Sequence, residues 1–279
     1  MDRGDERQKL ERTLLRDVGK AIADFDLVAD GDRIMVAMSG GKDSYALMHA
    51  LEALRGRAPI DFELVAVHLD QGQPGHDPRP LEQWLGERCI PYRFVREDTY
   101  SVVLEKVPEG KAYCSMCSRL RRGILYTTAR GLGCTKIALG HHRDDVIETL
   151  LLNLFCSGQL KAMPPKLVSD DGCNVVIRPL VYCAEADLAR LAASSHFPIL
   201  PCNLCGSQPD LERQFVKRLL RDLEARHPSV RASMLSALTN VRPTHLLDRD
   251  LWRSLGLDVA RADGEVRESL TRRRSGTVA

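Results

Sequence analysis

An apolar run that ends in a serine–glycine–glycine turn constrains this chain more than any other feature. The stretch Ile34–Ser44 reads IMVAMSGGKDS, and a helical pattern follows it. A strand, a glycine turn and a helix together form an anion site, because glycine lets the backbone approach a ligand closely and successive amides point at one spot. Ser39 and Ser44 add hydroxyl donors, and Lys42 adds a full charge. The expected occupant is a polyphosphate.

Predicted strands and helices alternate along most of the chain. Short apolar runs predict strands at 33–38, 62–69, 92–95, 136–139 and 175–180. Periodic apolar positions predict helices at 5–25, 44–54, 81–87, 114–130, 144–155, 184–195, 209–226 and 228–238. A loop is expected over residues 161–172. This alternation predicts an α/β fold, in which a parallel twisted sheet carries helices on both faces and a smaller helical part follows at the C-terminal side.

Composition narrows the class of protein. No apolar run approaches the length of a membrane span, and the N-terminal residues are charged, so we expect neither a transmembrane helix nor a signal peptide. Nine cysteines, an odd number, argue against a fully paired disulfide framework and favour reduced thiols in the cytoplasm. Two Cys-x-x-Cys pairs, Cys114/Cys117 and Cys202/Cys205, indicate metal or redox chemistry.

A second polar cluster follows the fourth predicted strand. Residues 139–151 read LGHHRDDVIETLL. In an open parallel sheet, ligands lie beyond the carboxyl ends of the strands. We therefore expect Ser39–Ser44, Asp70 and Gly140–Asp145 to share one cleft. Asp144 and Asp145 are expected either to hold Mg²⁺, which prefers oxygen ligands, or to cap the following helix.

Both clusters resemble motifs of a known superfamily. SGGKDS resembles the PP-loop motif, SGGxDS, of the ATP pyrophosphatases, and LGHHRDDVIETLL resembles the GHxxDDxxET signature of PP-loop enzymes that modify tRNA. The resemblance implies an adenine nucleotide alpha hydrolase-like fold and catalytic roles for Lys42, Asp43 and Asp145. The residues that it implies for ATP binding are Ser39, Gly40, Gly41, Lys42, Asp43 and Ser44.

Three further stretches resemble the tRNA 2-thiocytidine synthetases: GKAYCSMCSRLRRGILY at 110–126, MPPKLVSDDG at 163–172 and LPCNLCGSQPDL at 200–211. This resemblance implies an ATP-dependent tRNA sulfurtransferase that adenylates the C2 oxygen of cytidine 32 and replaces it with sulfur. It also implies a [4Fe-4S] cluster held by three cysteines, and ATP and Mg²⁺ as further cofactors. The cluster ligands carried over are Cys114, Cys117 and Cys205, with Cys202 as the open alternative to Cys205.

The same resemblance implies partners, whereas the pattern of predicted elements and the composition of the tail predict a division of the chain. The partners are the anticodon loop of tRNA, a cysteine desulfurase as sulfur donor, and a second copy in a homodimer. The expected parts are an N-terminal helix over 1–30, a PP-loop domain over 31–185, a helical region over 186–258 and a disordered tail over 259–279. The remaining cysteines are expected to be small buried apolar side chains; they are Cys89, Cys134, Cys156, Cys173 and Cys183.

Other functions remain open at this level. A PP-loop enzyme of the 2-thiouridine or lysidine type shares the first motif, and so does a ligase that activates a small acid or amide. A zinc-bound RNA-binding module without turnover would also use two cysteine pairs. Arg119, Arg121 and Arg122, just after the first pair, are expected either to meet RNA phosphate or to lie on a solvated helix face.

Overall fold

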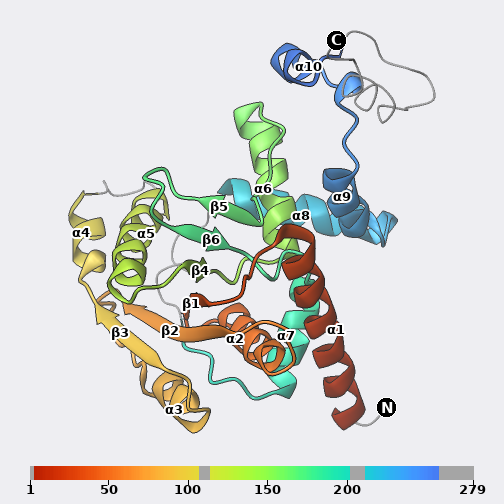
Figure 1. Ribbon diagram of the computed structural model, residues 1–279. Coiled ribbons are helices and arrows are strands. Elements are labelled where there is room, and N and C mark those ends of the chain that lie inside the picture. The colour runs from red at the N-terminus through yellow and green to blue at the C-terminus, as the bar shows by residue number, and fades with distance from the viewer. Residues whose placement is uncertain (1–2, 107–113, 202–210, 258–279) are drawn as a thin grey trace, which may run out of the picture. The chain divides into compact units, whose positions relative to one another are not determined.

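The computed structural model of the chain describes residues 3–106, 114–201 and 211–257 (Figure 1). The chain divides into two compact units, residues 1–228 and 229–279. The first unit contains the sheet and both sequence motifs that follow its strands. The domain boundaries expected from the sequence, at residues 30, 185 and 258, remain a prediction.

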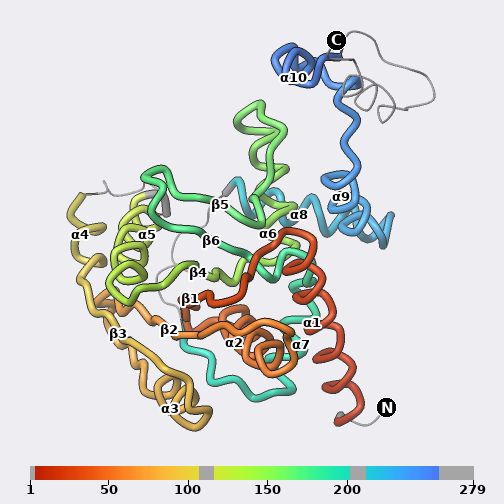
Figure 2. The backbone as a smooth tube through the Cα atoms, viewed as in Figure 1, coloured from red at the N-terminus to blue at the C-terminus, as the bar shows by residue number. Residues whose placement is uncertain are grey.

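The first unit is built on a six-stranded sheet with the strand order β3-β2-β1-β4-β6-β5. The strands are β1 (Asp32–Ala37), β2 (Phe62–Asp70), β3 (Tyr92–Arg96), β4 (Lys136–Ala138), β5 (Lys166–Val168) and β6 (Val175–Ile177). Every neighbouring pair is parallel except β5 with β6, which is antiparallel. The predicted parallel sheet is confirmed, and the tube in Figure 2 follows its path from strand to strand.

The edge strand β5 lies where the sequence predicted only a loop. Its three residues, Lys-Leu-Val, are all exposed. Because no face of this strand is buried, its sequence does not alternate between apolar and polar side chains. A short strand of this kind is defined by its pairing with β6, which periodicity along the sequence does not detect. The loop prediction for residues 161–172 was therefore wrong over Lys166–Val168.

Helices surround the sheet. In the first unit they are α1 (Arg3–Phe25), α2 (Lys42–Arg55), α3 (Arg79–Glu87), α4 (Thr99–Lys106), α5 (Cys114–Gly131), α6 (Arg143–Leu152), α7 (Glu185–Ser194) and α8 (Leu211–Arg226). A π-helical turn, Asn153–Ser157, continues α6. The sequence predicted all of these helices except α4, which is short and weakly amphipathic.

The central strands carry the core. Ile34, Met35 and Val36 of β1 are fully buried, because β1 lies between β2 and β4 and helices cover both faces of the sheet. On one face, Met35 packs in a cluster with Leu125 and Ala129 of α5. Burial on both faces explains the continuous apolar run that precedes the glycine turn.

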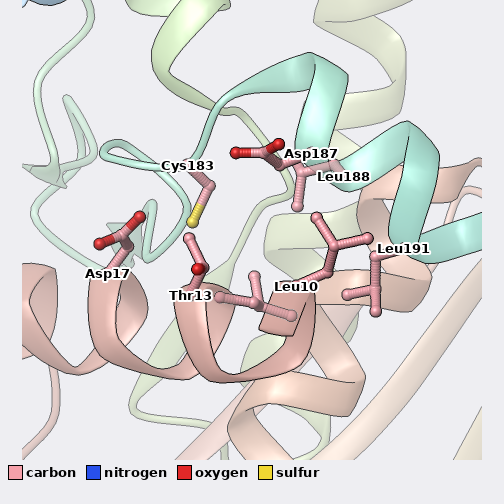
Figure 3. A pocket seen from close by; sticks show the side chains of 8 residues that line it. Leu10, Thr13, Asp17, Cys183, Asp187, Leu188 and Leu191 are labelled. Carbon is pink, nitrogen blue, oxygen red and sulfur yellow. The ribbon is translucent and has the colours of Figure 1, made fainter. Parts of the chain in front are cut away.

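On the other face α1, α2 and α7 pack against one another. Figure 3 shows the seam between α1 and α7, where Leu10 meets Leu191 and Cys183 lies beside Thr13. Burial raises the pKa of the Cys183 thiol, so this side chain stays neutral. The prediction of a small buried side chain is confirmed for Cys183.

For three other cysteines the same prediction was wrong, because Cys89, Cys156 and Cys173 are exposed. They lie at a helix end, in the π-helical turn and in the β5–β6 hairpin, where neighbouring elements do not cover them. Cys134 is partly buried.

The second unit, within its described residues 229–257, contains α9 (Val230–Thr239), a 3-10 turn (Pro243–His245) and α10 (Arg249–Leu255). The indole N–H of Trp252 donates to the carbonyls of Pro243 and Leu246, which ties α10 to the turn. Across the described part of the whole chain, none of the helices combines the length and the apolar character needed to span a membrane.

Candidate active site

The glycine turn joins β1 to α2 at the carboxyl edge of the sheet. Gly40 has a φ of +80°, and a Cβ atom there would lie 2.7 Å from the side chain of Leu200. The carbonyl of Gly40 also accepts a hydrogen bond of 2.9 Å from the amide of Leu200. Only glycine fits this conformation and this close approach without strain. The chain is thus held against the turn two residues before Cys202.

The two serines fix the shape of the turn. The amide of Gly41 donates to Ser39 Oγ at 3.3 Å, and Ser44 Oγ donates to the carbonyl of Gly41 at 2.8 Å. Gly41 is also the N-cap of α2, and no side chain of a described residue caps that helix. The first amides of α2 and its positive dipole end are therefore free to bind an anion.

Lys42 lies between two carboxylates. Its Nζ is 3.1 Å from Asp43 Oδ2 and 3.2 Å from Glu185 Oε1. Burial alone would lower the pKa of Lys42, but the two carboxylates outweigh it and the pKa is raised. Lys42 is therefore charged at neutral pH, and Glu185 is a site residue that the sequence motifs did not indicate.

The second motif lies directly beside the turn. A Cβ atom on Gly140 would come within 3.2 Å of the backbone carbonyl carbon of Asp43, so only a glycine lets β4 end this close to α2. His142 is the N-cap of α6 and shares a capping box with Asp145, whose Oδ2 accepts from the amide of His142 at 3.0 Å. The side chain of Asp144 is not part of this capping box, and its Oδ2 accepts from the amide of Glu185 at 2.8 Å.

These elements enclose a cleft of about 560 Å³, a volume in the usual range of ligand sites. It is lined by Ser39, Asp43, Ser44, Gly140 and Asp145 of the two motifs. From α5 it is lined by Cys117, Ser118, Arg121, Arg122, Leu125 and Tyr126, and after β6 by Arg178. Part of the predicted phosphate turn, part of the second motif and one cysteine of the first pair thus face one space, whereas Gly40, Gly41 and Lys42 of the turn do not line it.

Some predicted residues lie apart from this cleft. Asp70 does not line it, and its Oδ1 instead accepts from the amide of Gly72 at 2.9 Å. Arg119 is exposed, whereas Arg121 and Arg122 line the cleft.

The cysteine pairs are described only in part. Cys117 is half-buried, and its thiol lies 3.3 Å from Gln71 Oε1. Cys114 begins α5, one turn before Cys117. Cys202 and Cys205 lie outside the described residues.

A carboxylate oxygen in this cleft has no partner among the described residues. Asp43 Oδ1 is buried without a hydrogen bond, 4.0 Å from His142 Nε2. Because Asp43 and Asp145 both line the cleft, their carboxylates suit a hard divalent cation with oxygen ligands.

Arg178 is a cleft residue that the sequence analysis did not identify. It follows β6 directly. A charged residue at the carboxyl end of an apolar strand could have indicated this position, because the same pattern indicated the residues after β1 and β4.

Comparisons with known proteins point to one family. A PP-loop domain model matches residues 10–198. The tRNA-cytidine(32) 2-sulfurtransferase of Sorangium cellulosum (strain So ce56) is 60% identical over 260 residues, which cover 93% of this chain and 92% of the relative. The protein of the same name from Anaeromyxobacter sp. (strain K) is 63% identical over 247 residues, covering 88% and 85%.

A solved structure shows the same fold. The U34-tRNA thiolase NcsA from Methanococcus maripaludis, with its [4Fe-4S] cluster, superposes with a TM-score of 0.67 at 20% identity and covers 91% of each chain. On the PP-loop match and the two close relatives together, this chain belongs to the tRNA-cytidine(32) 2-sulfurtransferase family of PP-loop proteins.

Proposed function

We propose that this protein is an ATP-dependent tRNA-cytidine(32) 2-sulfurtransferase. The observation that carries the proposal is the shared cleft, in which the phosphate-binding turn and Cys117 face the same space. Such a cleft allows a nucleotide-activated base and a sulfur-carrying group to meet without leaving the protein. Family membership, at 60% identity over nearly the whole chain, supports the same activity.

The turn would bind the β,γ-diphosphate of ATP. The amides at the start of α2 would supply donors, and the hydroxyls of Ser39 and Ser44 would do so on turning from their bonds within the turn. Lys42 would exchange its carboxylate partners for the diphosphate, which carries more negative charge than either of them. Asp43, with its unpartnered Oδ1, and Asp145 would hold Mg²⁺, which would offset the negative charge of the phosphates.

The chemistry proceeds in two displacements. The C2 oxygen of the cytosine attacks the α-phosphorus of ATP, and pyrophosphate leaves with its charge matched by Lys42 and the α2 amides. The oxygen, a poor leaving group by itself, then departs from C2 as AMP when sulfide sulfur attacks that carbon. Positioning and electrostatics carry both steps, so no nucleophilic side chain is required.

The residues that would hold the iron–sulfur cluster are Cys114, Cys117 and Cys205, with Cys202 as the alternative to Cys205. Cys117 fits this role, because it lines the same cleft as Ser39, Asp43 and Ser44 of the phosphate turn. Leu200, which precedes the second pair, is hydrogen-bonded to Gly40 in that turn. A cluster with three protein thiolates would supply one iron open to an exogenous sulfide.

The tRNA would reach the cleft with its anticodon loop, where bases are splayed from the stack. Arg121 and Arg122 lie on the cleft wall contributed by α5, and their guanidinium groups suit RNA phosphate. We further propose a cysteine desulfurase as the source of sulfide, a homodimeric assembly and a cytoplasmic location.

Nucleoside analysis of tRNA tests this proposal. In a strain that lacks the gene, 2-thiocytidine should disappear, and the wild-type chain should restore it. Cys117→Ala and Lys42→Ala should not restore it, whereas Cys173→Ala, at an exposed cysteine of the β5–β6 hairpin, should. Unchanged 2-thiocytidine in the deletion strain would exclude this protein as its sole source. Anaerobic protein without iron after reconstitution would contradict the cluster.

A further inference from the structure

Two residues that line the cleft have buried polar atoms without partners among the described residues. His141 Nδ1 and Arg178 Nε make no hydrogen bond to any described residue. Both side chains line the cleft, and they follow β4 and β6, which are neighbours in the sheet. A buried polar group without a partner costs free energy, so such atoms in a ligand cleft indicate that a ligand completes them.

Arg178 is a buried cation held by carbonyl groups. The residue is 8% exposed, its Nη1 donates to the carbonyl of Pro164 at 2.6 Å, and its amide donates to the carbonyl of Pro165. No carboxylate of the described residues pairs with it, although arginine stays protonated in proteins. Arg178 therefore lines the cleft with an Nε–H that no described residue accepts from.

His141 offers the complementary group. Burial, with the nearby charge of Arg178, lowers the pKa of His141 to about 4, so its imidazole is neutral at neutral pH. A neutral imidazole has one N–H and one lone pair, whereas Arg178 can only donate. Together the two side chains can present a donor and an acceptor to one ligand edge.

The walls around this pair are largely apolar. Leu125 and Tyr126 of α5, Leu167 of β5 and Val176 of β6 line the same cleft. Such walls suit a flat, weakly polar ring, and an unstacked nucleobase packs well on aromatic and apolar side chains. Phosphate is a poorer match here than at Arg122, which is exposed and lies nearer to solvent.

We propose that Arg178 and His141 form the base-reading site for the target cytosine: Arg178 donates to N3 of the ring, and the His141 lone pair accepts from the exocyclic N4 amino group. This inference rests on the proposed function. Uracil presents an N–H at position 3 and a carbonyl at position 4, so it would place donor against donor and acceptor against acceptor. The pair would thus select cytidine over uridine.

Binding of two anticodon stem-loops, identical except for C or U at position 32, tests this pair in the iron-loaded protein with a non-hydrolysable ATP analogue. We expect the wild type to prefer the C32 loop by about tenfold or more. Arg178→Gln and His141→Leu should remove most of that preference, and His141→Asn, which keeps an acceptor, should restore part of it. Affinity for the ATP analogue alone should stay within about twofold, which also shows that each variant is folded.

Arg122→Gln is the matched control, since it removes a guanidinium from the exposed wall of the same cleft. It should weaken both loops equally, lower the salt dependence of binding and keep the preference for C32. If Arg178→Gln proves unstable, Arg178→Lys retains the charge but not the fixed Nε–H, and it should also lose the preference.

The other outcomes overturn the inference in distinguishable ways. If Arg178→Gln weakens the ATP analogue and leaves the C32 preference unchanged, Arg178 binds a nucleotide phosphate instead. If the variants keep the preference while the wild type makes 2-thiocytidine, this base-reading site is wrong and the proposed function stands. If the wild type neither prefers C32 nor makes 2-thiocytidine, the proposed function fails with it.

Discussion

The two edges of the sheet differ in whether their buried charged side chains have hydrogen-bond partners within the protein. At the amino edge, Asp32 is 7% exposed, and its carboxylate accepts from Lys136 Nζ, from Thr135 Oγ1 at 2.7 Å and from the amide of Ala29 at 2.6 Å. Lys136 is almost equally buried. Both oxygens of the Asp32 carboxylate therefore accept hydrogen bonds from groups within the protein.

At the carboxyl edge the polar groups are left incomplete. Asp43 Oδ1, His141 Nδ1 and Arg178 Nε are buried without partners among the described residues. The N-terminus of α2 lacks a side-chain cap there as well. The difference teaches that the Asp32–Lys136 pair at the amino edge is satisfied within the protein and serves stability, whereas the carboxyl edge retains unmet polar groups for ligands at a cost in stability.

Breaking the ion pair at the amino edge should have the largest effect. Lys136→Met leaves the buried Asp32 carboxylate without its cation, and we expect the free energy of unfolding to fall by about 3–5 kcal/mol. Urea denaturation measures this. Adding Asp32→Leu should recover most of the loss, since an apolar pair replaces the charged one. A loss below about 1 kcal/mol for Lys136→Met would show that the pair is not a stability element.

The equivalent change at the carboxyl edge should affect activity instead. Lys42→Met removes the charge that would meet the diphosphate, and we expect tRNA-dependent pyrophosphate release to fall about 100-fold. The free energy of unfolding should change by less than about 1 kcal/mol, because the ion pairs of Lys42 are partly solvated. Lys136→Met is the control and should keep its rate per folded molecule. A Lys42 variant that loses stability and activity together would remove the contrast between the edges.

Two glycines with the same backbone conformation sharpen the comparison. Gly31, near the amino edge, has a φ of +75°, and a Cβ atom there would have no atom of a described residue within 4 Å, whereas one on Gly40 would meet Leu200. Gly31→Ala should cost about 1 kcal/mol from the conformation alone. Gly40→Ala should cost more and should also weaken binding of an ATP analogue by about tenfold, since a shift of the turn displaces its amides. Calorimetric titration with the analogue compares the two, and equal affinities would contradict the assigned role of the turn.

A smaller effect should appear in the dependence of stability on pH. Burial alone would raise the pKa of Asp32, but hydrogen bonds from Lys136, Ala29 and Thr135 outweigh it and lower the pKa. A lowered carboxyl pKa contributes stability that is present above the unfolded value of about 4 and is lost as pH falls below it. Urea midpoints at pH 7 and pH 3 should therefore differ less in the Asp32→Leu, Lys136→Met double variant than in the wild type. An equal difference in both proteins would assign the acid sensitivity to other carboxyl groups.

Much of the fold was predictable from the sequence because the central strands are buried on both faces. The run before Ser39 and the run before Gly140 both read as strands, and the rule for strand ends brought their motifs to one edge. Helix α4 and strand β5 were missed, since neither has a periodic pattern of its own and both depend on tertiary packing.

Site residues that belong to a contiguous sequence motif could be predicted. Site residues that come together only through folding of distant segments could not. Asp145 lies in the cleft and also caps α6, so the two readings of this carboxylate are compatible. Glu185 and Gln71 became visible only in three dimensions, because their contacts to Lys42 and Cys117 join segments far apart in the chain. The predicted third ligand, Cys205, lies outside the described residues.

The central claim is that nucleotide and sulfur chemistry share one cleft. Alkylation of cluster-free protein, followed by peptide mass spectrometry, tests it directly by comparing Cys117 on the cleft wall with Cys173 in the exposed β5–β6 hairpin. A saturating ATP analogue should slow modification of Cys117 by about tenfold, because the ligand occupies the cleft that gives access to the thiol, and should leave Cys173 unchanged. Equal rates at Cys117 with and without bound analogue would contradict the account.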